Sequence, residues 1–378
     1  MSQSKRDPIA IGYLPWAGLH EEFRIGPVSF WPFREKVEEK IPDCGMRAEL
    51  DEFFKTFVDH EGAPVKTILA CSCGELGYRR FSDEELESIV AAVDCLIFAT
   101  IASGTENGVL ANNNSMAPPS ADRFDLSGRW VWPIEDGLVI KTEHSTNLWS
   151  RGEYKITRPL SLGGSFCGNY KPLLQGLGCI FGEHFPEDVR ERLFRSLEWF
   201  RFAHTESTTV SWLHKVVMMS TAFEILLQFP NRDQKMYFAQ QIDKRLRLKD
   251  SIVAKRADAK GKEYEGCLAA WWAWDFYHLR GRIVHGNAVT AQDQQYKDWI
   301  SHLNVADLVL LELVKKLLFQ HHCIGEDMRR RAAECAASSG SSAEELEEAM
   351  LPGLLGLNFE PVHKALGWIP PSDQRKDK

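Results

Sequence analysis

The chain has 378 residues, of which 44% are hydrophobic and 26% are charged. This length favours about two domains, and the composition is that of a globular protein that buries a core without covalent cross-links. The net charge of -8 and the pI of about 5.9 exclude a globally basic nucleic-acid coat, so any contact with RNA must use a local basic patch.

The 9 cysteines are scattered along the chain. An odd, dispersed set does not form a disulfide framework and favours a reducing compartment. No segment has the roughly 18 unbroken apolar residues of a membrane span, and the polar first residues lack the apolar stretch of a signal peptide. We therefore expect a cytoplasmic protein without membrane association.

Residues 1–185 are expected to form a mixed, strand-rich domain that senses or regulates. The apolar, β-branched run Val65–Cys71 predicts a strand. Ser82, with Glu85 three residues later, predicts a capped helix start. Asp94–Ala102 is interpreted as a buried strand, and Arg129–Ile134 with Gly137–Thr142 as a hairpin. The glycines after residue 160 form no nucleotide-binding motif.

The pattern becomes helical at Pro186, because proline followed by acidic residues favours a helix start. Apolar residues then recur at three- and four-residue steps, which predicts a helical bundle over residues 186–325 and an α+β protein overall. The next helices are predicted at Ser211–Phe229, Asp233–Leu248, Glu263–Ile283 and Asp293–Phe319. A tail, 326–378, carries two predicted short helices, Met328–Ala337 and Ser342–Met350.

One motif in the bundle suggests chemistry: Arg280 is followed, after four residues, by His285. Three segments precede or contain it in order: Trp199–Ala203, Ser220–Leu227 and Tyr277–Gly286. Together they resemble the Apea-like branch of the HEPN family over about residues 186–322, roughly a third of the chain.

The resemblance implies a helical bundle that forms a homodimer and cleaves single-stranded RNA without a metal or cofactor, in bacterial defence or toxin settings. His285 would be the general acid/base, and Arg280 would bind the phosphate. Arg282 would be a second phosphate contact, with Glu224, Tyr277, His278 and Asn287 in supporting positions.

The residue chemistry agrees with these roles. Histidine titrates near neutral pH and can move the 2′-hydroxyl proton, while the forked arginine cation suits the charge that develops on phosphorus. Five residues apart, Arg280 and His285 differ by about 140° around a helix, so a phosphate is engaged more easily where two protomers meet or where Gly281 and Gly286 bend the chain.

Other interpretations remain open. The family usually has a polar residue where this chain has Gly281, so a non-catalytic dimerisation, nucleotide-binding or RNA-binding module that regulates a partner protein is the alternative. His285 precedes Gly286, which also suits a helix C-cap. Arg280 could form an ion pair with Glu224, and His278 could serve packing alone.

Two further segments have two interpretations each. The aromatic run Trp271–Tyr277 could stack RNA bases, although core or interface packing is favoured. Gln241–Lys262 carries a net charge of about +5 and could attract RNA or form a solvated surface. Its candidate RNA contacts are Lys244, Arg245, Arg247, Lys255 and Arg256.

Cysteine spacing does not support a metal site. Cys71 and Cys73 enclose a single residue, and with Cys44 and His60 they lack the paired spacing of a zinc knuckle. We therefore expect no metal.

Overall fold

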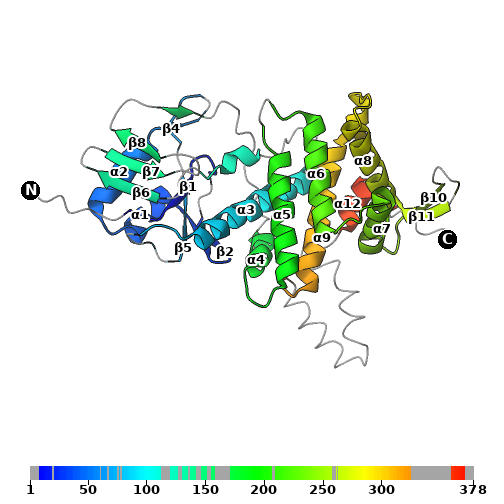
Figure 1. Cartoon of the computed structure of the whole chain (residues 1–378), viewed down its shortest axis with the longest axis horizontal. Helices are drawn as coiled ribbons and strands as arrows, with labels where there is room; N and C mark the ends of the chain where they lie inside the picture. Colours follow the sequence, from blue (N-terminus) through cyan, green and yellow to red (C-terminus); the bar gives the residue numbers. More distant parts are fainter. Residues whose placement is uncertain are drawn as a thin grey trace, which may run out of the picture.

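The computed structural model describes residues 8–18, 21–59, 61–65, 68–74, 76, 79–111, 120–126, 130–134, 137–141, 146–150, 155–157, 171–206, 209–257, 261, 263–324 and 359–370. Within them, the sheets of β1–β9 lie at the N-terminal end, and long helices with two short two-stranded sheets form the rest (Figure 1). The α+β class expected from the sequence is confirmed. Both short tail helices and His60 lie outside the described residues.

The largest sheet is antiparallel, in the order β1-β5-β3-β2. The strand predicted at Val65–Cys71 overlaps β5 at Leu69–Cys71, and β5, which is buried throughout, begins and ends later than predicted. The strands span Gly12–Leu14 (β1), Phe23–Ile25 (β2), Val28–Pro32 (β3) and Leu69–Cys73 (β5). Helices α1 (Phe33–Lys40) and α2 (Cys44–Phe54) bury Phe33 and Phe54 in a second apolar cluster beside it.

The predicted hairpin is confirmed: β6 (Trp130–Ile134) pairs antiparallel with β7 (Gly137–Lys141), and β8 (Thr146–Ser150) continues the meander. Two further short strands, β4 (Phe57–Val58) and β9 (Ile156–Thr157), pair in parallel.

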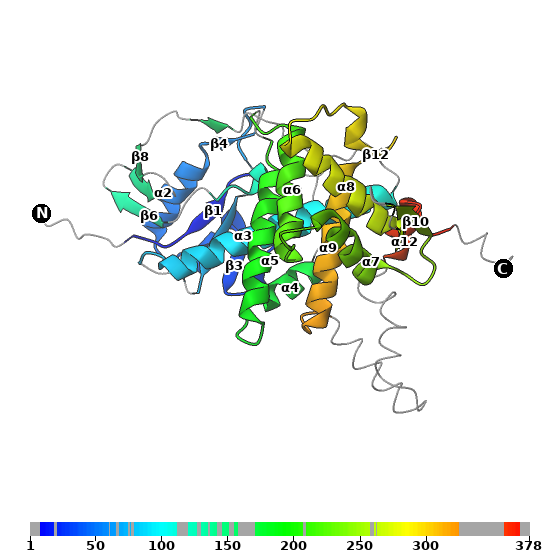
Figure 2. The ribbon, with the colours of Figure 1, turned by 45° about the vertical axis from the view of Figure 1, so that its right-hand side comes forward.

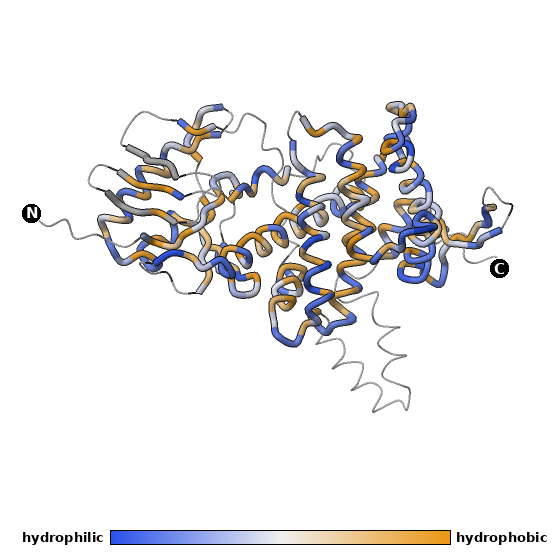
Figure 3. Tube along the Cα trace, viewed as in Figure 1, coloured by the Kyte–Doolittle hydropathy of each residue, from blue (hydrophilic) through white to orange (hydrophobic). Residues whose placement is uncertain are grey.

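Helix α3 (Asp83–Leu110) corrects one prediction. It starts at the expected capping box, where the Ser82 hydroxyl accepts from the Glu85 N–H at 3.2 Å and the Glu85 carboxylate accepts from the Ser82 N–H at 2.8 Å. Asp94–Ala102, interpreted as a strand, is the middle of this helix. Every residue from Val93 to Ala102 is buried, so no exposed polar face reveals the helical period, and this part of α3 is mostly orange in Figure 3.

By length and hydropathy α3 could cross a membrane, but 72% of its most apolar window is buried inside the protein. A core helix shows the same combination. Helices α5 and α9 pack against α3, and one apolar cluster includes residues from both sides of residue 185. The domain boundary expected there stays a prediction.

The C-terminal half is a helical bundle in which α5 packs on α6 and α7 on α8. The helices predicted from Ser211 and Asp233 are present. The Ile252 N–H, just before β10, donates to the Trp368 carbonyl after α12 at 2.8 Å, and Figure 2 shows α12 next to β10. The helices span Lys171–Cys179 (α4), Glu187–Ala203 (α5), Trp212–Leu226 (α6), Gln234–Leu246 (α7), Leu268–Val284 (α8), His302–Gln320 (α9) and Glu360–Ala365 (α12).

Two helices begin later in the structure than the sequence predicted. Residues 263–267, expected to be helical, form β11 (Glu263–Cys267), which pairs with β10 (Val253–Ala257). Residues 293–301 form a 3-10 turn followed by β12 (Gln295–Lys297) and β13 (Ile300–Ser301). Helix α9 begins only where the Ser301 hydroxyl caps it by accepting from the Asn304 N–H at 3.2 Å.

Candidate active site on helix α8

The end of α8 is set by a glycine motif. Gly286 has a φ of +70°, its N–H donates to the Ile283 carbonyl at 3.1 Å, and the Asn287 N–H donates to the Arg282 carbonyl at 2.9 Å. These bonds close the last turn as a Schellman motif. His285 is therefore the C-cap residue of α8, as the Gly286 helix stop predicts, and its side chain is exposed.

Arg280, one turn earlier, belongs to a polar group that we call the Arg280 cluster: Glu224, Gln234, Tyr277 and Arg280. The expected ion pair is present, since Arg280 Nη2 lies 3.2 Å from Glu224 Oε1. The Tyr277 hydroxyl donates to the same carboxylate oxygen at 2.7 Å and lies 2.8 Å from Gln234 Oε1. The guanidinium also sits over the Tyr277 ring, 5.4 Å from its centroid.

One hydrogen-bond donor in the Arg280 cluster has no partner among the described residues. Arg280 Nε is buried and has no hydrogen-bond partner among the described residues, although the side chain as a whole is 24% exposed. Burial, then the hydrogen bond to Glu224, raises the pKa of Tyr277 above its usual value, so the phenol stays protonated and keeps donating. An oriented arginine whose side chain is partly exposed suits an incoming anion.

The remaining motif residues differ in availability. His278 and Asn287 are exposed, as His285 is. Arg282 is engaged: Nη1 lies 2.6 Å from Asp293 Oδ1, and Nη2 donates to the Ala288 carbonyl. The hydrogen bond between Arg282 and Asp293 is also the main cause that lowers the pKa of Asp293 below its usual value. Arg282 thus holds the loop after α8, and a phosphate would compete with Asp293 for it.

The basic candidates lie at the other end of the α7–α8 pair. Gln234, at the start of α7, reaches Tyr277 near the end of α8, whereas Asp243, near the end of α7, accepts from the Cys267 N–H at 2.8 Å, just before α8. The two helices are therefore antiparallel. Lys244, Arg245 and Arg247 end α7 and Lys255 and Arg256 lie on β10, so one protomer does not bring them to Arg280.

Several of these cations already have partners. Arg247 pairs with Asp243 at 2.7 Å, Arg256 pairs with Asp275 at 2.7 Å, and Arg245 donates to Gln241. Lys244 and Lys255 are exposed and form no ion pair within the described residues.

The aromatic run Trp271–Tyr277 contains both buried and partly buried side chains. Trp271, Trp272, Phe276 and Tyr277 are buried, as the core interpretation predicts. Trp274 is only partly buried, and the ammonium of Lys235 lies 4.1 Å from the centroid of its ring.

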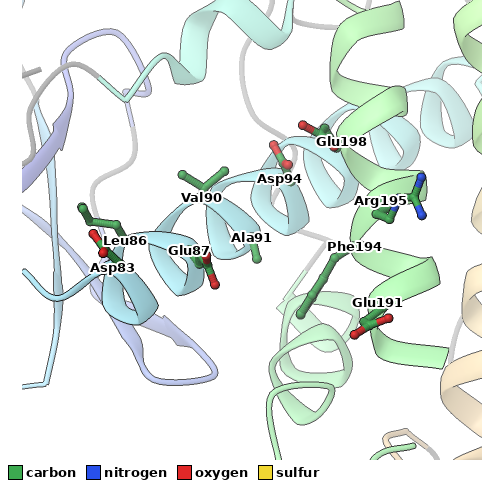
Figure 4. Close-up of a pocket in the computed structure, with 10 residues that line it drawn as sticks. All are labelled: Asp83, Leu86, Glu87, Val90, Ala91, Asp94, Glu191, Phe194, Arg195 and Glu198. Carbon is green, nitrogen blue, oxygen red and sulfur yellow. The ribbon is translucent and has the colours of Figure 1, made fainter. Parts of the chain in front are cut away.

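A separate hollow of about 820 Å³ lies between α3 and α5, away from α8 (Figure 4). Phe194 reaches into it from α5, and carboxylates outnumber cations around it. Asp94 is the buried member: burial raises its pKa to about 7 against the pull of Arg201, whose Nε donates to it at 2.6 Å. The sequence analysis did not predict the Asp94–Arg201 pair, because it interpreted 94–102 as a strand, although Arg201 lies in the segment Trp199–Ala203.

Within the described residues, no three histidine, cysteine or acidic side chains converge to form a metal site. Comparisons with protein-family models, with curated proteins and with solved structures found no match. The HEPN resemblance accordingly stays a prediction that depends on the quoted segments.

Proposed function

We propose that the protein is a metal-independent endoribonuclease of the HEPN type that cleaves single-stranded RNA. The observation that carries the proposal is the Arg280 cluster. Glu224 and Tyr277 orient the guanidinium, and the Arg280 side chain stays 24% exposed, so a phosphate oxygen can approach it. Exposed His285, one turn further along α8, supplies a side chain that can accept and return a proton near neutral pH.

The proposed reaction is transesterification. The RNA 2′-oxygen attacks the adjacent phosphorus, the bond from phosphorus to the 5′-oxygen breaks, and a 2′,3′-cyclic phosphate and a 5′-hydroxyl result. His285 accepts the 2′-hydroxyl proton, and the partner subunit's His285 gives a proton to the leaving 5′-oxygen. Arg280 stabilises the charge on the phosphorane, a role for which a forked, permanently charged donor is suited.

A homodimer would complete this site. Val284, beside His285, is a large apolar side chain that is 50% exposed. If two α8 ends meet there, Val284 is covered and both histidines approach one phosphate. The resemblance further implies cytoplasmic action in bacterial defence or a toxin system, with a regulatory partner protein.

The test incubates labelled single-stranded RNA with the protein in EDTA. His285→Ala and Arg280→Ala should each lower the cleavage rate by about 100-fold or more, since general acid–base catalysis and charge stabilisation each contribute effects of that size. Exposed His184 and Arg195, remote from α8, give the matched controls His184→Ala and Arg195→Ala, which should cleave at the normal rate. Cleavage that survives both motif substitutions would remove this assignment.

The alternative is a non-catalytic module that binds RNA or a nucleotide and regulates a partner. The ion pair with Glu224 and the bare Gly281 favour it, because both can leave Arg280 as a binding residue only. It predicts RNA binding that Arg280→Ala weakens and no cleavage by any form. Sedimentation analysis addresses the dimer: a strict monomer at micromolar concentration excludes the shared site.

A further inference from the structure

One side of α8 is partly or fully exposed from Trp274 to the end of the helix. Trp274, His278, Gly281 and His285 follow one another at steps of four, three and four residues, which places them on one stripe of the helix. We call these residues the α8 stripe. His278 and His285 are exposed and Trp274 is partly exposed, whereas Trp272, Phe276 and Leu279 on the other faces are buried.

The middle of the α8 stripe is bare. A Cβ placed on Gly281 would meet no heavy atom within 4 Å, so the helix backbone itself is accessible there. A flexible chain can approach a helix more closely at such a position than over any larger side chain.

The far end of the α8 stripe combines an aromatic ring and a cation. Lys235, in the first turn of α7, holds its ammonium 4.1 Å from the Trp274 ring centroid and forms no ion pair within the described part of the chain. The neighbouring carboxylate of Asp275 is paired with Arg256 at 2.7 Å. Asp233, exposed before α7, is flanked by exposed Arg232. The unpaired positive charge of Lys235 therefore favours an anionic ligand at this end of the α8 stripe.

We propose that the α8 stripe binds single-stranded RNA, with one base stacked on Trp274 in place of the Lys235 ammonium, which then binds the neighbouring phosphate. Trp274 lies eleven residues before His285, about 16 Å along the helix axis. The strand would thus cross bare Gly281 between the stacked base and the bond that Arg280 and His285 cleave. This inference rests on the proposed function and adds to it a binding subsite remote from the reacting phosphate.

Aromatic stacking with an adjacent cation is how proteins bind unpaired bases without reading their sequence. A duplex keeps its bases stacked inside and cannot offer one to Trp274. The α8 stripe therefore predicts a preference for single strands and a weak dependence on base identity.

Binding is measured by fluorescence anisotropy of a labelled single-stranded oligoribonucleotide on the His285→Ala protein, which would not cut it. Adding Trp274→Ala should raise Kd by about 10-fold or more, the range of a lost base stack. Trp274→Phe should restore most of the affinity. Lys235→Ala should raise Kd several-fold and lower the slope of log affinity against log salt by about 1.

Matched controls are Trp199→Ala, a partly buried tryptophan on α5, and Lys215→Ala on α6, both expected to bind normally. Equal Kd values for the Trp274, Lys235 and control variants would overturn the inference, while cleavage by the unmodified chain would still support the nuclease. A Trp274→Ala protein that binds RNA normally but no longer dimerises would overturn it too, since the ring would then serve a protein interface. If no form binds RNA, both proposals fail.

Discussion

The histidine–carboxylate pairs around α9 and the arginine–histidine motif of α8 use similar side chains in opposite ways. Around α9, His363 Nε2 lies 3.0 Å from Glu312 Oε2, and the two side chains are 1% and 2% exposed. His204 Nε2 lies 3.0 Å from Asp307 Oδ1, and the second Asp307 oxygen accepts from the Thr105 hydroxyl at 3.1 Å. These groups pair with other groups of the protein and join α9 to α3, α5 and α12.

On α8 the same chemistry remains available. Arg280 is 24% exposed although one of its nitrogens pairs with Glu224, and His285 is exposed at the end of its helix. The difference teaches that a buried polar group is fixed by the partner that offsets its lost hydration, whereas a polar group at a helix end can keep its bonding capacity for a ligand. Four substitutions test this contrast, in order of expected effect.

The largest effect is expected at Glu312. Glu312→Ala leaves His363 buried without its partner and should lower the free energy of unfolding by about 3–5 kcal/mol. Glu312→Gln keeps a hydrogen bond and should lose less. Urea denaturation measures both, with exposed Glu38→Ala as control. A loss below about 1 kcal/mol for Glu312→Ala would show that the pair is not a stabilising element of the core.

Asp94 shows the pH dependence of a buried carboxyl. Its pKa is raised to about 7, so the folded protein holds a proton that the unfolded chain releases near pH 4. Its contribution to stability is therefore full below about pH 4 and falls as pH rises towards 7, by up to about 4 kcal/mol.

Asp94→Asn removes this dependence. Compared with the unmodified chain, the variant should gain relative stability between pH 5 and pH 8 in urea unfolding, whereas exposed Glu87→Gln in the same hollow should show no such change. A constant stability difference across that range would contradict the raised pKa.

Tyr277→Phe tests the support of Arg280. The lost hydroxyl donates to the Glu224 carboxylate at 2.7 Å, and a hydrogen bond to a charged group contributes about 1.5–3 kcal/mol. We expect a stability loss near the lower figure, because Arg280 still pairs with Glu224, and a lower cleavage rate at unchanged Arg280 charge. A variant that loses stability but keeps full activity would show that Tyr277 has no role in positioning.

The smallest expected effect is a gain in stability, for Gly281→Ala. Gly281→Ala places a methyl group in open space on α8, and alanine is favoured over glycine inside a helix by about 0.5–1 kcal/mol. Thermal unfolding of the free protein should therefore occur at a slightly higher temperature. RNA affinity should fall modestly, since the methyl group covers the bare segment of the α8 stripe; unchanged affinity would argue against close approach there.

Local signals predicted much of this structure. Ser82 and Glu85 placed the start of α3, and Glu135-Asp136 between two apolar runs indicated the β6–β7 hairpin. Periodicity identified α6 and α7, and Gly286 identified the end of α8. The errors occurred where burial is complete or where pairing is remote: Asp94–Ala102 has no polar face, and Glu263–Cys267 becomes a strand because Val253–Ala257 lies beside it.

The sequence alone determined the capped start of α3, the glycine stop of α8 and the proximity of Arg280 and His285 on one helix. Tertiary structure decided which of the polar groups are free to act. Folding brings Glu224 and Gln234 from separate helices to Tyr277, ties Arg282 to Asp293 and places the basic residues of α7 and β10 at the far end of α8. Such distinctions depend on contacts between residues distant in sequence, which no local pattern records.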